Sequence, residues 1–143
     1  MPRITIRCNG KFTETKANSS TYNLVGNSFE SNQASIESLE GHSAYDREDR
    51  KYSFQFTMKT SEGEFRVKPL KGAAPFQSGY QATFYCPLPC GTWHKVEITT
   101  LMGDRDAGTG YGKPEVYSTT LDFNIQEDPY FDPDAPKNKL FTR

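Results

Sequence analysis

The chain has 143 residues, and its 17 basic side chains nearly balance its 18 acidic ones. This balance excludes the broad basic excess on which non-specific nucleic-acid binding usually rests. The length is typical of one domain, and ten Phe with eight Tyr favour a β-sheet protein with an aromatic core over a helical bundle rich in Leu and Ala.

The N-terminus, MPRITIRCNG, lacks the apolar stretch of a secretory signal, and no segment is as long as a membrane span. The odd number of cysteines, three, fits a reducing compartment better than a secreted disulfide framework. We therefore expect a protein of the cytoplasm, or of a virion if the source is viral, with no membrane partner.

The first element is an alternating run, RITIRC, which Asn9 and Gly10 separate from a second run, KFTETK. Asn-Gly between two alternating runs is the strongest short-range signal of a β-hairpin, because both residues tolerate the positive φ of a type I′ turn. The pattern thus predicts two strands joined by a tight turn, with a third short strand at residues 21–25.

The next segment, SNQASIESLEG, carries Ile36 and Leu39 at helical spacing and ends in Gly41, a common C-terminal stop. It is predicted as the only helix of the chain. Residues 45–51, YDREDRK, alternate acids with bases and are predicted to form a solvated loop.

Residues 51–59, KYSFQFTMK, give the clearest strand pattern, because aromatic and apolar side chains alternate with polar ones. Tyr52, Phe54, Phe56 and Met58 share one face, which we interpret as core. With the TSEGE turn and the FRVKP run that follows, residues 51–69 form a predicted hairpin.

Further strands are predicted at residues 81–86, 93–102 and 116–125, which makes about seven or eight strands separated by turn signals. This pattern predicts an all-β fold: an antiparallel β-sandwich, with a small OB-like β-barrel as the alternative. We assign residues 1–126 to this domain and residues 127–143 to an extended C-terminal arm that contains several prolines.

The stretch TFYCPLPCGTWHKVEI holds Cys86, Cys90 and His94, whose spacing a zinc site permits. A second close pair of ligands is missing, and the Pro-Leu-Pro link is too stiff to wrap a metal. We therefore predict a strand, a turn and a second strand, with His94 on the apolar face and with neither a metal nor a cofactor. Because no catalytic motif is present, we expect no enzyme activity.

The arm is the part of the sequence that is most informative about function. Its first part is acidic and its prolines prevent a helix, yet it carries apolar side chains that a solubilising tail does not need. Four of these are predicted to bind a partner: Tyr130, Phe131, Leu140 and Phe141.

We thus expect a non-enzymatic structural or accessory subunit that acts through protein–protein contacts, as a homo-oligomer or in a larger assembly such as a viral particle. One alternative is an OB-like barrel that binds single-stranded nucleic acid through aromatic and basic side chains. Its candidate residues are Tyr52, Phe54, Arg66, Lys68, Lys71, Tyr80 and Tyr85. The other alternative is a carbohydrate-binding sandwich that uses Trp93, Tyr111 or Tyr117.

Overall fold

The computed structural model describes residues 3–15, 20–87, 91–101, 103–106 and 114–134. These residues form nine β-strands and contain no helix. The strands are β1 (Ile4–Glu14), β2 (Thr21–Ser31), β3 (Ile36–Asp46), β4 (Lys51–Thr60), β5 (Gly63–Gly72), β6 (Gln81–Pro87), β7 (Trp93–Thr100), β8 (Asp104–Asp106) and β9 (Val116–Glu127). Within these ranges, nothing forms a helix of the length and apolarity that a membrane span needs.

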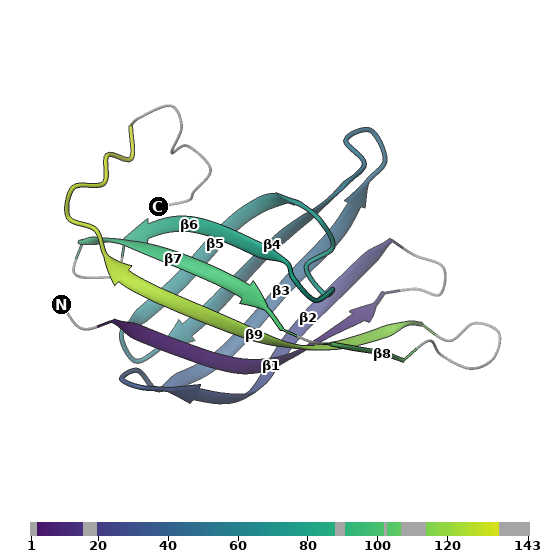
Figure 1. The fold of residues 1–143 in the computed structure, drawn as a ribbon, viewed down its shortest axis with the longest axis horizontal. Helices are drawn as coiled ribbons and strands as arrows, with labels where there is room; N and C mark the ends of the chain where they lie inside the picture. The colour runs from purple at the N-terminus through teal and green to yellow at the C-terminus, as the bar shows by residue number, and fades with distance from the viewer. Residues whose placement is uncertain (1–2, 16–19, 88–90, 102, 107–113, 135–143) are drawn as a thin grey trace.

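A single antiparallel sheet contains all of these strands, in the order β5-β4-β3-β2-β1-β9-β7-β6, with β8 beside β9. The order is a meander in which β1 returns to pair with β9. The sheet curls until it nearly closes into a barrel, so that β6, β7, β9 and β1 lie in front of β3, β4 and β5 in Figure 1. The predicted all-β antiparallel class is confirmed, and the curled sheet is consistent with the sandwich or barrel architecture.

Alternate residues of most of the long strands point into the barrel and fill it. The burial pattern of β1 is strictly alternating until near its end, and Phe12 is completely buried. Rings from different strands meet inside: Phe12 and Phe54 have centroids 5.8 Å apart, and Phe56 lies 5.7 Å from Phe84. The predicted core face is confirmed for Phe54, Phe56 and Met58, each at most 3% exposed. Its fourth member, Tyr52, is partly buried and packs against the core.

The predicted hairpin at Asn9 and Gly10 is wrong, because β1 runs straight through both residues. Gly10 points into the barrel, where a Cβ atom would come within 2.9 Å of Leu121 and 3.1 Å of Leu24. The pairing register with β2 also shifts between Arg7 and Asn9. Glycine is needed here for close packing at an irregular point of the sheet, and not for a turn.

The predicted helix at residues 31–41 is also wrong, because Ile36 to Asp46 form strand β3. In a regular strand, residues three apart would point to opposite faces. The register between β3 and β4 shifts between Ile36 and Ser38, and this irregularity lets Ile36 pack against the core that buries Leu39. A β-bulge thus produces the spacing that resembles a helix.

Other elements were predicted with small errors. The hairpin at residues 51–69 is present as β4 and β5. The solvated loop predicted at 45–51 is shorter than expected, because β3 ends at Asp46 and β4 begins at Lys51, which leaves an exposed turn at 47–50. The strand predicted at 21–25 extends to Ser31. The short strand β8 was not predicted; it lies in the glycine-rich stretch before β9, part of which is outside the described residues.

The antiparallel meander gives the barrel two ends. Strands β1, β3, β5 and β7 end at one end of the barrel, where the turn 47–50 and the connection 73–80 also lie, and we call this the loop end. Strands β2, β4 and β6 end at the other, where the connections 32–35 and 61–62 lie, and we call this the tail end because β9 leads there into residues 128–134 (Figure 1).

Candidate functional site

The C-terminal segment, residues 128–134, leaves the barrel at the tail end and turns back onto it. The amide of Asp128 donates to the carbonyl of Trp93 at 2.8 Å, which continues the pairing of β9 with β7 by one residue. Two further hydrogen bonds form a tight turn: the amide of Phe131 donates to the carbonyl of Asp128 at 3.3 Å, and the amide of Tyr130 donates to the Asp128 carboxylate at 3.2 Å. The segment is therefore held on the barrel.

Phe131 is the side chain that docks the segment. Its ring is stacked on Tyr85 with centroids 4.2 Å apart and an interplanar angle of 14°, and it lies 4.7 Å from the ring of Trp93. Tyr85 and Trp93 come from β6 and β7, at positions that alternate with the buried Cys86 and His94, so they face outward. We call these two residues the aromatic platform.

Tyr130, next to the docked residue, has no comparable cover. Its side chain is 93% exposed, the highest value among the exposed large hydrophobic residues of the described chain. The other two predicted partner-binding residues of the arm, Leu140 and Phe141, lie outside the described residues. The structure thus shows a fixed segment that carries one docked, partly buried aromatic ring and one presented aromatic ring.

The aromatic residues of the nucleic-acid alternative do not form one open face. Phe54 is 1% exposed and Tyr80 6%, so neither ring is available to stack on a base. Tyr85 is covered by Phe131, and Tyr52 packs against Tyr45 and Phe76 with centroids 5.1 and 5.4 Å away. Of the aromatics in the carbohydrate alternative, Trp93 contacts Phe131 and Tyr117 packs on Phe76, while Tyr111 is outside the described residues.

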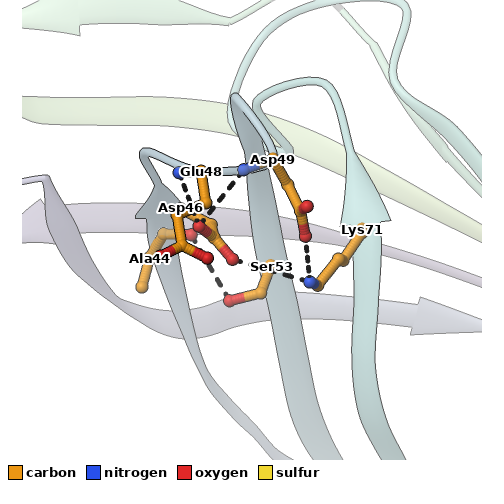
Figure 2. A network of polar contacts seen from close by, with 6 residues as sticks. All are labelled: Ala44, Asp46, Glu48, Asp49, Ser53 and Lys71. Atoms are coloured by element: carbon orange, nitrogen blue, oxygen red, sulfur yellow. Dashed lines mark hydrogen bonds and ion pairs between the residues drawn. The ribbon is translucent and has the colours of Figure 1, made fainter.

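The basic residues of the nucleic-acid alternative, Arg66, Lys68 and Lys71, lie on β5. Lys71 is engaged with the turn between β3 and β4, as Figure 2 shows: its ammonium group contacts Asp49 closely and lies 3.5 Å from Asp46. Arg66 is paired with Glu64 at 2.7 Å, whereas Lys68 is exposed and appears in none of these ion pairs. Much of the positive charge of β5 is therefore balanced by neighbouring carboxylates.

The turn that Lys71 contacts is itself built around a carboxylate. Asp46 accepts hydrogen bonds from the amides of Glu48 at 2.9 Å and Asp49 at 3.3 Å, and these backbone donors, with Lys71 nearby, lower the pKa of Asp46 (Figure 2). Arg50 completes the turn with a φ of 55°. This network is a structural clamp between β3, β4 and β5.

A second polar cluster, which the sequence did not reveal, closes the loop end. Glu115 accepts hydrogen bonds from the hydroxyl groups of Tyr117 at 3.1 Å and Tyr22 at 3.4 Å, and it is paired with Arg105. The hydrogen bond from Arg105 is the main cause of a lowered pKa at Glu115. Burial raises the pKa of Tyr22, which therefore stays a hydrogen-bond donor at neutral pH.

Glu14 lies beside this cluster and is only 6% exposed. Its carboxylate accepts a hydrogen bond from the amide of Glu115 at 3.2 Å. The position of Glu14 is the one feature of the sequence that could have indicated this cluster. Glu14 follows Phe12 on the buried face of an alternating strand, and a buried carboxylate needs a hydrogen-bond or ion-pair partner. Because its members satisfy one another, the cluster acts as a polar seal.

Phe76, from the connection between β5 and β6, plugs the barrel just below this seal. The ring is 3% exposed and has centroid distances of 4.1 Å to Tyr117, 4.6 Å to Tyr22 and 5.6 Å to Phe12. Thr100 holds the plugging connection, because its hydroxyl donates to the carbonyl of Gln77 at 2.6 Å and accepts from the amide of Tyr80 at 3.0 Å.

Cys86 and His94 are cross-strand partners whose side chains point into the barrel, 3% and 4% exposed. Burial raises the pKa of Cys86 to about 12, so its thiol stays protonated at neutral pH. His94 makes a 2.8 Å hydrogen bond from Nδ1 to the carbonyl of Thr92. The predicted inward position of His94 is confirmed, and this pair offers no open nucleophile.

Glu127 on β9 is the cross-strand partner of His94 on its other side. Among the described residues, Glu127 and His94 do not form an ion pair with each other. Cys90, the third candidate zinc ligand, lies outside the described residues. That the stretch binds no metal therefore stays a prediction, which elemental analysis of the purified protein can test.

Comparison with protein-family models, with curated proteins and with solved structures found no match to this chain.

Proposed function

We propose that this protein is a non-enzymatic structural or accessory subunit that works through protein–protein contacts, with the C-terminal segment as its contact element. One observation carries the proposal: Phe131 fixes the segment on the barrel, while the neighbouring Tyr130 is 93% exposed.

A fixed segment with a presented tyrosine has the properties of a contact element. Tyrosine offers a large rigid ring and a hydroxyl group, and it is enriched among the residues that dominate binding energy. Holding the backbone in place before binding reduces the entropy lost on association. The Asp128 turn and the stacked Phe131 ring provide such holding here.

The barrel supports the same proposal as a scaffold. Its inward positions carry buried side chains that pack on one another, and the loop end is covered by Phe76 and the Glu115 cluster. Chemistry inside the barrel would require these groups to move apart, whereas a partner can reach the outer face at the tail end directly.

The partners we propose are protein subunits, either copies of this chain or members of a larger assembly. Whether that assembly is cytoplasmic or a viral particle stays a prediction from the sequence.

The test is sedimentation velocity of the purified chain over a range of concentrations. We expect association that weakens about tenfold or more in Tyr130→Ala, which is typical of an interface hot spot, and that is largely kept in Tyr130→Phe. Val25→Ala is the matched control, because Val25 is also exposed, at 56%, but lies on β2. Deletion of residues 129–143 should abolish association and leave the barrel folded.

A chain that stays monomeric at every concentration, or whose association is unchanged by Tyr130→Ala and by the deletion, would contradict the contact function of the segment.

A further inference from the structure

We propose that the outer edge of β6 is a second contact site, which takes up an extended segment of a partner protein as an additional strand. The inner side chains of this added strand are apolar, and its outer side chains are neutral or acidic. The site is separate from the C-terminal segment, so this inference goes beyond the proposed function.

The sheet is open along one line. β5 and β6 are the two terminal strands of the sheet and do not pair with each other, although the sheet nearly closes. A cleft of about 670 Å³ lies between them and is lined by residues 69–73 and 79–83. Several of these residues are glycine or alanine, whose small side chains leave the backbone within reach. The cleft is therefore bordered by two strand edges.

The hydrogen bonds of β6 show which of its backbone groups face the cleft. The amide of Thr100 donates to the carbonyl of Tyr80 at 2.9 Å, and these two residues are opposite each other in the register of β6 with β7. Bonded positions alternate along an antiparallel pair, so Ala82 also directs its backbone groups to β7. Those of Gln81 and Thr83 point the other way, toward the cleft, where no strand of the described chain pairs with β6.

The two edges differ in how they resist an added strand. Natural edge strands are usually protected by charged side chains, by proline or by a β-bulge. β5 has all three: Lys68 and Pro69 are both exposed, and its register with β4 shifts between Phe54 and Phe56. β6, from Gln81 to Pro87, has no charged residue, and its one proline is the last residue. The edge of β6 is therefore the one that accepts a strand.

The cleft also defines the chemistry of the added strand. Side chains on the inner face of that strand would lie beside Ala82, which packs against the core, and across the cleft from the buried Leu70. Of the described residues that line the cleft, Lys71 alone is charged. A segment with apolar inner side chains and neutral or acidic outer ones matches both faces.

The experiment uses a short, blocked, fluorescently labelled peptide in which Val alternates with Thr and Glu. We expect fluorescence anisotropy to show that it binds the full chain. The same peptide with N-methylated backbone amides has the same side chains but no backbone donors, and it should bind about tenfold or more weakly.

The matching change in the protein is Thr83→Pro. This variant removes an amide that faces the cleft and leaves the ladder with β7 intact, so the melting temperature should stay close to that of the wild type. Peptide binding should weaken about tenfold or more. Thr83→Val is the control, because it keeps the amide and should bind the peptide as the wild type does.

Hydrogen exchange of the wild type tests the same edge without a substitution. In the chain alone, the amides of Gln81 and Thr83 should exchange fast and that of Ala82 slowly, and the peptide should slow the first two.

Three results would each overturn the inference: no peptide binding up to about 1 mM, binding that is insensitive to N-methylation and to Thr83→Pro, or slow exchange of both amides in the chain alone. The proposed function is tested separately, because Tyr130→Ala changes the C-terminal segment and leaves β6 intact. Unchanged association of Tyr130→Ala would contradict that function whatever the peptide does.

Discussion

The two ends of the barrel are built differently. At the loop end, Phe76 is inserted among the rings of Phe12, Tyr22 and Tyr117, and Glu115 binds the two tyrosine hydroxyl groups and Arg105 above it. At the tail end, Phe131 lies on the outside of the sheet, on Tyr85.

This difference suggests different roles for the two ends, one in the stability of the domain and the other in contacts with partners. A ring inside a barrel is surrounded by other side chains and contributes mainly to folding, whereas a ring on an outer face leaves the fold intact when it leaves. The loop end thus packs as part of the domain interior, whereas the tail end is the site at which we propose that partners bind. The predictions below test that division, from the largest expected effect to the smallest.

The middle of the barrel sets the reference for both ends. Phe54 is 1% exposed and has ring neighbours in Phe12, Phe56 and Tyr80. We expect Phe54→Ala to lower the free energy of unfolding by about 3–5 kcal/mol, because it leaves a cavity that the rigid sheet fills poorly. Urea unfolding measures this, with Val25→Ala as the control that should change stability by less than about 0.5 kcal/mol. Equal stability of the two variants would show that the filled interior does not carry the fold.

At the loop end we expect Phe76→Ala to destabilise by roughly 3 kcal/mol, the lower part of the range for buried aromatics, since the site lies close to solvent. The variant should keep its association at the tail end, as sedimentation at matched protein concentration would show. Loss of association at unchanged stability would reverse the roles that we assign to the two ends.

The sequence predicted more of the tail end than of the loop end. Strict alternation identified the face of Phe54, Phe56 and Met58, and the change in composition after β9 identified Tyr130 and Phe131 as unusual. The prediction from sequence was wrong where a local irregularity of a strand produced a pattern that is typical of another element. The register shift beside Ile36 produced helical spacing, and the close packing at Gly10 produced a turn signal.

The polar cluster of the loop end could not be predicted because its members are distant in the chain. Glu14, Tyr22 and Glu115 come together only through the pairing of β1 with β2 and of β1 with β9. No spacing in a single segment reports such a meeting. Only the unusual position of Glu14, on an apolar strand face, was visible in advance.

Because of the Glu115 cluster, we expect the stability of the folded protein to depend on pH in the acidic range. Arg105 and the tyrosine hydroxyl groups lower the pKa of Glu115 below its ordinary value of 4.5. A lowered pKa in the folded state means that this stabilisation is complete above the unfolded value and is lost as the pH falls through the folded value. We expect the stability difference between the wild type and Glu115→Gln to be largest near neutral pH and to shrink below about pH 4.5.

Thermal unfolding across pH 3–7 measures this effect, and Glu62→Gln serves as the control because Glu62 is an exposed residue of the turn between β4 and β5. A difference between wild type and Glu115→Gln that is independent of pH would mean that the charge of Glu115 is not what seals the loop end.

The smallest effect on stability is expected at the tail end. Phe131 is partly exposed, and a stacked aromatic pair contributes about 0.5–1.5 kcal/mol beyond its buried area. Because Phe131 follows the last strand, its removal breaks no strand pairing, and we expect Phe131→Ala to lower the free energy of unfolding by about 1 kcal/mol or less.

The same variant should loosen the C-terminal segment more than it destabilises the whole domain. Hydrogen exchange at the Asp128 amide, which is bonded to the Trp93 carbonyl, should accelerate, while the amides of β1 and β4 keep their protection. If Phe131→Ala instead destabilises the barrel as much as Phe76→Ala, the C-terminal segment is an integral part of the domain, and the two ends do not differ in the way described here.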